Sequence, residues 1–316
     1  MHTEAQFREG QTFGGGSLAA RYASFVKLPH TLFALPFAGV GAIFASWQYP
    51  SNLTVWTAVW ILLAFTAARF AAMGFNRIVD RRFDAMNPRT ARRELPAGRL
   101  SLAQASAAVA VSAVGFAGAA WMLNPLCGIL APVALGWIFF YSYTKRFTAW
   151  SHHVLGLALG IAPSGAFLAV SGAWPEPWYA LPVLSAAVMF WVAGFDVIYA
   201  LQDLDFDRTH HLHSIPAHLG TTRALRLARV FHGIAFLLFG SIAVFDLLPT
   251  GVFYAAGVLV MAGLLIYEHR IIDTRDPEAI DLPRIDRAFF HANVAVSTSF
   301  FGFVLLDRLL GGTLPL

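Results

Sequence analysis

The chain has 316 residues, of which 57% are hydrophobic and 13% are charged, whereas soluble domains carry about 25% charged residues. This composition excludes an ordinary soluble domain and predicts a membrane protein. The formal net charge is +4, and the one cysteine, Cys127, lies in an apolar run. A single cysteine excludes an internal disulfide and a cysteine-based metal site.

Nine apolar stretches follow one another along the chain, and stretches of about 20 residues can cross a bilayer as helices. They lie near residues 25–46, 53–75, 102–123, 125–143, 152–172, 178–201, 224–247, 251–271 and 288–310. The predicted fold class is all-α, in a multi-pass membrane protein. Residues 1–20 lack the apolar core and cleavage site of a signal peptide, so we expect a flexible tail there and a single transmembrane domain over residues 21–316.

Basic residues divide the connections between these stretches into two kinds. Twenty of the 22 Lys and Arg residues, all but Arg69 and Arg308, lie in the N-terminal tail or on alternate connections. The other connections read SWQYPSN, NP, GAWPEP and DLLPT and contain none. Because cytoplasmic loops are enriched in Lys and Arg, the N-terminus is predicted to be cytoplasmic, with the chain in the inner (cytoplasmic) membrane. The net charge then reflects topology, and no nucleic-acid partner is needed to explain it.

The second apolar stretch runs directly into the charged segment FNRIVDRRFDAMNPRTARRELPAGR, residues 75–99. Asn76, Asp80 and Asp84 recur every four residues, so on an α-helix they share one face. Ordinary helix ends also carry solvated charge, which is the simplest explanation for any one of these residues. Two carboxylates one turn apart repel each other, however, and this spacing favours a bound cation between them.

A similar pattern follows the sixth apolar stretch, in FDVIYALQDLDFDRTHHLHSIPAHLG, residues 195–220. Asp203 and Asp207 are four residues apart, and Asp196 precedes Asp203 by seven. On a continuous α-helix all three would share a face. The two longest polar connections therefore both carry paired carboxylates, which predicts a functional site on the cytoplasmic side.

Paired carboxylates surrounded by arginines suit Mg²⁺, which is held by one or two carboxylates together with substrate phosphates. Arg and Lys neutralise the remaining phosphate oxygens. The predicted cofactor is Mg²⁺ and the predicted substrate is a diphosphate. The chain contains no GxxxxGK[ST] motif, which argues against a nucleoside triphosphate held by a P-loop. The histidines of HHLH adjoin no second ligand cluster with zinc-site spacing, so zinc is not favoured.

The segments NRIVDRRFD and QDLDFD, each following an apolar helix, resemble the two aspartate motifs of the UbiA superfamily of intramembrane aromatic prenyltransferases. Further similar segments are KLPHTLFALPFA, NPRTARRELPAG and YSYTKRFT, in the same order. Within the superfamily the chain looks closest to the 4-hydroxybenzoate polyprenyltransferase-like group. The resemblance implies a prenyltransferase domain with nine helices in a ring around a central cavity, capped on the cytoplasmic side by the two long connections.

The resemblance also implies roles for individual residues. The Mg²⁺ and diphosphate site would comprise Asn76, Asp80, Asp84, Asp203 and Asp207. Tyr141 and Lys145, one turn apart in YSYTK, would contact the diphosphate, although Lys145 could also be a snorkelling residue at a helix end. The residues expected to be catalytic are Asp80, Asp203, Asp196 and Lys145.

Other charged residues have two interpretations each. Arg69 lies two turns before Asn76 in an apolar stretch, where an arginine is energetically costly. It either pairs with Asp196 for structural reasons or faces the cavity to bind the acceptor carboxylate or the diphosphate. Asp196 is expected to orient or deprotonate a phenol. Arg77, Arg81 and Arg208 flank the carboxylates and are candidates for phosphate contacts, but each could equally anchor the helices to lipid.

The predicted reaction transfers a polyprenyl group from a prenyl diphosphate to a ring carbon of an aromatic acid, with 4-hydroxybenzoate as the first choice of acceptor for quinone biosynthesis. A dihydroxynaphthoate acceptor for menaquinone is the alternative. A membrane transporter is a candidate of a different class, because charged residues within membrane helices also mark ion pathways. Transporter sites tend to lie near the membrane midplane, whereas these carboxylates gather where apolar runs meet basic connections.

Overall fold

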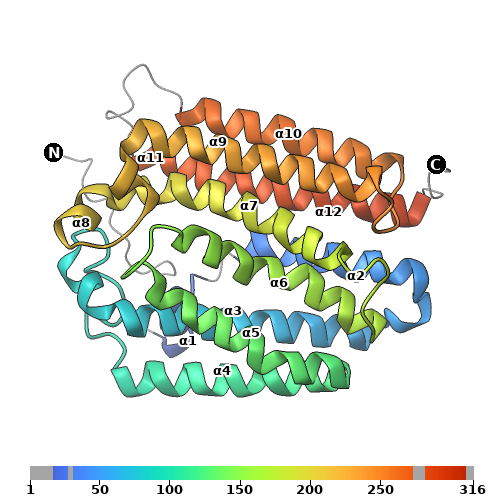
Figure 1. Cartoon of the computed structure of the whole chain (residues 1–316). Helices are drawn as coiled ribbons and strands as arrows, with labels where there is room; N and C mark the ends of the chain where they lie inside the picture. The colour runs from blue at the N-terminus through green and yellow to red at the C-terminus, as the bar shows by residue number, and fades with distance from the viewer. Residues whose placement is uncertain (1–16, 28–30, 273–281, 311–316) are drawn as a thin grey trace.

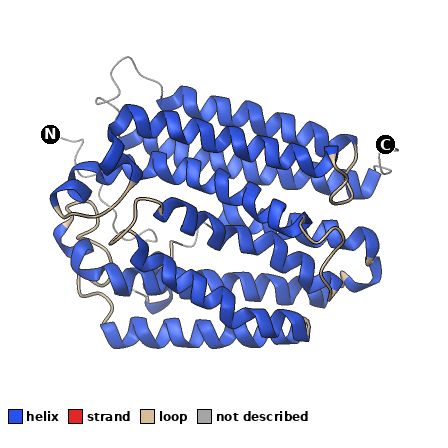
Figure 2. Ribbon diagram, in the orientation of Figure 1, coloured by secondary structure: helices blue, strands red, loops and turns tan. Residues whose placement is uncertain are grey.

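The computed structural model describes residues 17–27, 31–272 and 282–310, and in these ranges the chain is helical with no β-strand (Figure 2). Most of the predicted tail, residues 1–16, lies outside the described residues, and its flexibility stays a prediction. The elements are α1 (Leu18–Phe25), α2 (Thr31–Gln48), η3 (Pro50–Asn52), α3 (Val55–Met86), α4 (Leu102–Leu123), α5 (Pro125–Thr144), α6 (Ser151–Ser171), α7 (Ala180–Ala200), η4 (Leu201–Asp203), α8 (Leu204–Thr209), α9 (Ile215–Val244), α10 (Val252–Ile272), α11 (Leu282–Asp286), the π-helix η6 (Arg287–Ala292) and α12 (Asn293–Leu310).

Eight helical segments of the described chain are long and apolar enough to cross a membrane, which makes this a multi-pass membrane fold. The first predicted stretch corresponds to α2, an 18-residue helix that is not among those eight. The long helices lie side by side (Figure 1). We call the end that carries α8 and the connection after α3 the aspartate end, and the opposite end, which carries η3, the far end.

Capping residues set several of the helix boundaries. Ser101 accepts a hydrogen bond from the Gln104 backbone N–H, and the Gln104 side chain accepts one from the Ser101 backbone, so a complete capping box begins α4. Asn124 ends α4 and caps α5 through the Cys127 N–H, at 2.9 Å. Its amide also donates to the Leu168 carbonyl of α6. One asparagine therefore turns the chain between two helices and attaches that turn to a third.

The main apolar core lies where α2, α7, α9 and α12 meet. The Phe37 ring lies 4.8 Å from the Trp191 ring and 5.8 Å from the Phe239 ring, and Phe239 lies 5.0 Å from Phe300. All four side chains are fully buried. Aromatic pairs at these distances add to the energy of burial alone. This core holds the C-terminal helices against α2 and α7.

Glycines allow α6 to approach its neighbours closely. A Cβ atom at Gly160 would lie 2.5 Å from the Ser185 carbonyl oxygen of α7, and one at Gly156, one turn earlier, would collide with the Met189 carbonyl. The Ser185 hydroxyl donates to the Gly160 carbonyl at 2.8 Å. Small residues four apart are a common means of close helix packing in membranes. They bring the backbones of α6 and α7 into contact.

Replacing Gly156 with alanine should lower the thermal stability of the detergent-solubilised protein. The added methyl group meets backbone rather than a movable side chain, and such overpacking costs about 1–3 kcal/mol. The matched control is Gly118→Ala in α4, where a Cβ atom meets nothing within 4 Å and the helix should be unchanged or slightly more stable. Equal melting temperatures for Gly156→Ala and Gly118→Ala would contradict this account of the α6–α7 contact.

Candidate active site

The first aspartate motif lies on the last turns of α3. This helix has 32 residues, so at about 1.5 Å per residue it is far longer than the hydrocarbon core of about 30 Å. The Asn76 amide donates to Asp80 Oδ2 at 3.1 Å, which confirms that these two residues share a face. Asp80 and Asp84 are buried, although both carry charge. Buried carboxylates require cationic or hydrogen-bonding partners, and the surrounding segments supply them.

The second motif does not lie on one continuous α-helix, which the prediction of a shared helical face for Asp196, Asp203 and Asp207 had assumed. Helix α7 carries Asp196 and ends at Ala200, where the chain tightens into the 3₁₀ turn η4 before α8 begins at Leu204. A 3₁₀ turn advances the chain by 3.0 rather than 3.6 residues per turn, so the angular register changes. Asp203 is thereby directed toward the connection after α3.

That connection, residues 87–101, crosses to the second motif and brings cations to both. Arg89 bonds Asp203 through two nitrogens, at 2.9 and 2.5 Å, and the Asn87 amide donates to the same carboxylate at 2.8 Å. Arg93 pairs with Asp84 at 2.8 Å. The paired side chains are at most 21% exposed, so solvent screens these interactions only in part.

Two further cations come from the end of α5. Lys145 Nζ lies 3.1 Å from Asp80 Oδ2, and Arg146 lies 3.2 Å from Asp80 Oδ1. Burial alone would lower the pKa of Lys145, but Asp80, with smaller contributions from Asp207 and Asp84, raises this pKa above its usual value. Lys145 also interacts electrostatically with Asp203. Lys145, predicted from the sequence as a diphosphate contact, thus interacts with both motifs. We call the four aspartates of the two motifs the aspartate cluster: Asp80, Asp84, Asp203 and Asp207.

The three predicted flanking arginines make other contacts. Arg77 forms a buried ion pair with Glu94 at 3.0 Å, in which the side chains are 5% and 1% exposed. Arg81 donates to the Ile78 carbonyl of its own helix. Arg208 donates to the Ala217 carbonyl. Sequence reasoning instead missed the cations that do contact the cluster, Arg89, Arg93 and Arg146, although they lie inside the family-like segments NPRTARRELPAG and YSYTKRFT.

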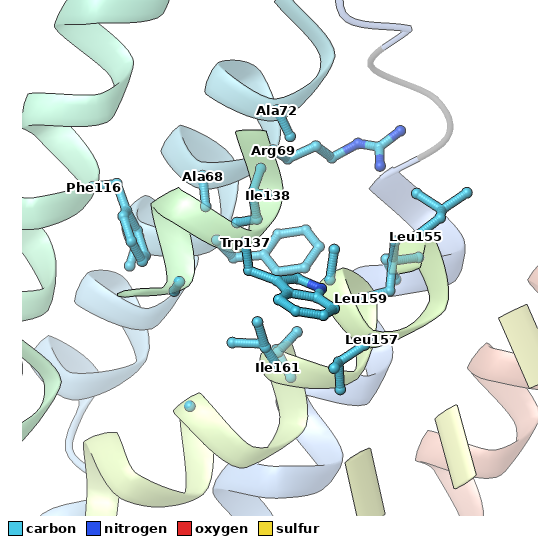
Figure 3. Close-up of a pocket in the computed structure, with 18 of the residues that line it drawn as sticks. Ala68, Arg69, Ala72, Phe116, Trp137, Ile138, Leu155, Leu157, Leu159 and Ile161 are labelled. Carbon is cyan, nitrogen blue, oxygen red and sulfur yellow. The ribbon is translucent and has the colours of Figure 1, made fainter. Parts of the chain in front are cut away.

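A mainly apolar cavity of about 610 Å³ lies beside the aspartate cluster (Figure 3). Within the described part of the chain its lining comes from Lys27, from α2 to α7 and their connections, and from Phe289, with none from α9, α10 or α12. The cavity is therefore enclosed by part of the bundle and not by every helix. Figure 3 shows Trp137, Ile138 and Leu159 in its wall, with the Arg69 side chain extending from α3 above them. Asn76 and Arg93 line the cavity and bond Asp80 and Asp84, and Tyr141, also in the lining, interacts electrostatically with Asp80.

Arg69 and Asp196 both line this cavity, but they do not form the pair considered from the sequence. Asp196 Oδ2 lies 2.7 Å from His152 Nδ1, and His152 is its hydrogen-bond partner among the described residues. Arg69, Asp196 and Tyr141 are among the polar side chains in a mainly apolar lining, which also includes the hydroxyls of Ser164 and Ser185. Their positions suit a small polar aromatic molecule more than a metal ion.

The aspartate cluster offers the oxygen ligands that Mg²⁺ prefers. Asp84 Oδ2 is buried and has no hydrogen-bond partner among the described residues, as expected of an oxygen that a cation could use. Among the described residues, no group of three His, Cys, Asp or Glu side chains lies close enough together to hold a metal ion. The carboxylates of the cluster are instead paired with arginine and lysine. The chemistry of the donors fits the cation predicted from the sequence.

The sequence model that describes the UbiA prenyltransferase family matches residues 34–294 of this chain. The chain belongs to the UbiA prenyltransferase family. This confirms the resemblance predicted from the aspartate motifs. The protein is thus a membrane prenyltransferase of this family, and a transporter is not supported.

Curated relatives with similar sequences include 4-hydroxybenzoate octaprenyltransferases. A 4-hydroxybenzoate octaprenyltransferase from Nitrosospira multiformis is 33% identical over 251 residues, which cover 78% of this chain and 82% of that protein. The protein of the same name from Escherichia fergusonii is 28% identical over 276 residues, covering 84% of this chain and 91% of that one.

Solved structures show the same fold. A UbiA homologue from Aeropyrum pernix K1 is 33% identical with a TM-score of 0.77, covering 88% of this chain and 98% of that one. A UbiA homologue from Archaeoglobus fulgidus, solved bound to DMAPP and Mg²⁺, is 20% identical with a TM-score of 0.70, covering 92% and 99% of the two chains.

The Arg77→Ala variant tests whether Arg77 is a structural residue. Removing the arginine leaves Glu94 buried and uncompensated, which should lower the free energy of unfolding by about 3–5 kcal/mol. The control is Arg81→Ala, whose side chain bonds only the preceding turn and which should stay near wild type. Both variants should be compared by thermal unfolding in detergent and by binding of a prenyl diphosphate analogue. Normal stability with lost analogue binding would assign Arg77 to the diphosphate instead.

Proposed function

We propose that this protein transfers a polyprenyl group from a prenyl diphosphate to a ring carbon of an aromatic acid, with 4-hydroxybenzoate as the acceptor. The observation that carries the proposal is the direct junction of an apolar cavity with a cluster of four aspartates and four cations, at Asn76, Arg93 and Tyr141. A prenyl diphosphate has the same division into a charged head and an apolar tail. The cavity would receive the tail while the head remains at the aspartate end.

The aspartate cluster and Asn76 would hold Mg²⁺, which supplies positive charge to a departing diphosphate. The bound DMAPP and Mg²⁺ of the Archaeoglobus fulgidus homologue support this assignment. Lys145, Arg146, Arg89 and Arg93 pair with the carboxylates in the present structure. When a diphosphate binds, these cations and the Tyr141 hydroxyl can turn to its oxygens.

The reaction breaks the allylic carbon–oxygen bond, and its electron pair leaves with the diphosphate. Positive charges fixed around the leaving group stabilise the negative charge that develops there. The apolar walls exclude water from the cationic allylic carbon. The ring carbon next to the phenol hydroxyl then forms the new bond, and a base takes the proton from that carbon, which restores the aromatic ring. Arg69 would bind the acceptor carboxylate, and Asp196 its hydroxyl.

Two lining residues indicate where a long prenyl chain leaves the cavity. Val133 of α5 is 69% exposed and Trp174, in the connection after α6, is 48% exposed, although both line the cavity. The cavity thus reaches the side of the bundle toward the far end, where the surface meets lipid. Such an opening would accept prenyl chains longer than the cavity itself.

The choice of acceptor rests on the relatives named 4-hydroxybenzoate octaprenyltransferase, at 28–33% identity. A dihydroxynaphthoate remains the alternative, with ubiquinone or menaquinone biosynthesis as the corresponding pathway. We further propose that α2 is a ninth membrane crossing, so that nine helices form the bundle. The basic residues then place the N-terminus and the aspartate end in the cytoplasm, with the protein in the inner membrane.

Product analysis tests this proposal directly. Purified protein incubated with Mg²⁺, a prenyl diphosphate and a panel of phenolic acids should yield a prenylated 4-hydroxybenzoate, identified by mass spectrometry. A prenylated naphthoate without a 4-hydroxybenzoate product would overturn the choice of acceptor and leave the chemistry intact. No prenylated product from any phenolic acid would overturn the proposed function.

In the same assay, Asp203→Asn should reduce turnover by a factor of about 10² or more, as expected for a fixed charge in the transition state. The matched control is Asp205→Asn, two residues away. The Asp205 side chain is exposed, and the hydrogen bond from the Thr209 hydroxyl is accepted by the Asp205 backbone carbonyl. Chelation with EDTA should remove wild-type turnover, and Mg²⁺ should restore it. Equal activity of the two variants, or turnover that resists EDTA, would contradict the metal assignment.

A further inference from the structure

His152 of α6 and Asp196 of α7 form a pair at the wall of the cavity. His152 Nδ1 lies 2.7 Å from Asp196 Oδ2, and the histidine side chain is 4% exposed. Asp196 is 19% exposed and lines the cavity, whereas His152 is not part of the lining. The carboxylate thus faces the chamber, and the imidazole supports it from behind.

A backbone amide determines the tautomer of His152. The Ile215 N–H donates to His152 Nε2 at 3.2 Å. An amide nitrogen can only donate, so Nε2 must present its lone pair, and in the neutral imidazole the ring proton is on Nδ1. The Nδ1–H group therefore donates to Asp196 Oδ2. This assignment follows from heavy-atom positions and requires no observed hydrogen.

The second oxygen of the carboxylate remains available. His152 bonds Oδ2, and Asp196 Oδ1 has no hydrogen-bond partner among the described residues. Because Asp196 lines the cavity, a ligand there can donate a hydrogen bond to Oδ1. A carboxylate held on one side by an imidazole N–H keeps its other oxygen in a defined direction.

We infer that His152 is a positioning residue, which orients Asp196 so that Oδ1 accepts a hydrogen bond from the ring hydroxyl of the aromatic acceptor. The inference rests on the proposed function and names the acceptor group that this site recognises. It also connects the two ends of the site. Ile215 begins α9, the first helix after the second motif, and the His213 N–H just before it donates to the Lys145 carbonyl at 2.7 Å, so this segment contacts both Lys145 and His152.

Acceptor kinetics and equilibrium binding in four variants test this role. His152→Leu should lower kcat/KM for the phenolic acid by about 10- to 100-fold, the usual effect of losing a hydrogen bond to a charged group. Binding of a prenyl diphosphate analogue should be unchanged. His152→Asn, whose amide can replace Nδ1–H, should recover part of the loss. In the Asp196→Asn background, His152→Leu should have little further effect, because it acts through that carboxylate.

His153→Leu is the matched control. His153 is the adjacent residue, packs edge-on against Phe190 and Phe231 at 5.5 and 4.5 Å, and does not line the cavity. It should retain normal acceptor kinetics. Additive effects of His152→Leu and Asp196→Asn, or a loss in His153→Leu equal to that in His152→Leu, would overturn the inference.

A ligand comparison works without any variant. Wild-type protein should bind the phenolic acid that it prenylates at least 10-fold more tightly than the O-methyl ether of that acid, which cannot donate to Oδ1. Asp196→Asn and His152→Leu should lose this discrimination. Equal wild-type affinity for both compounds would overturn the inference even if every variant failed to fold. A wild-type protein that prenylates no phenolic acid would instead overturn the proposed function, and the inference with it.

Discussion

Charge balance at the end of α3 is the constraint on which the site depends. Asp80 and Asp84 are buried one turn apart, and cationic partners offset the cost of removing these carboxylates from water. The cations come from two separate segments, with Arg93 in the connection after α3 and Lys145 and Arg146 at the end of α5. Each ion pair therefore fixes the position of a different part of the chain. In the proposed function the same cations exchange a carboxylate for a phosphate oxygen, so the contacts that assemble the cluster would also prepare it for a diphosphate.

Helix packing places the acceptor groups at a different depth from this cluster. The close approach of α6 to α7, at Gly156 and Gly160, brings His152 against Asp196. Asp196 lies within α7, before the 3₁₀ turn that holds Asp203, and Arg69 precedes Asn76 by seven residues of α3, about 10 Å at about 1.5 Å per residue. One apolar cavity includes both acceptor candidates and ends beside the aspartate cluster. The fold therefore places these two groups of residues at different depths along a single chamber, as the proposed diphosphate and aromatic sites require.

Local sequence patterns predicted much of this arrangement. The range 102–123 predicted for the third stretch is that of α4, because the capping box SLAQ and Asn124 define both ends. The four-residue spacing was also sufficient to predict that Asn76, Asp80 and Asp84 share one face of α3, since that helix continues unbroken to Met86. The 3₁₀ turn at Leu201–Asp203 could not be read from spacing, and it changed the register of the second motif. Residue spacing also could not show which arginines pair with the aspartates. Arg89 and Asp203 are 114 residues apart, and only the folded connection brings them together.

The division of the chamber into two binding sites is the central claim, and equilibrium binding tests it most directly. A non-hydrolysable prenyl diphosphate analogue and the aromatic acid should each be titrated, with Mg²⁺ present, into wild-type protein, Asp80→Asn and Arg69→Ala. Asp80→Asn should weaken binding of the analogue and leave affinity for the aromatic acid unchanged. Arg69→Ala should do the reverse. If Arg69→Ala abolishes binding of the analogue while the aromatic acid binds normally, Arg69 belongs to the diphosphate site and the division by depth is wrong.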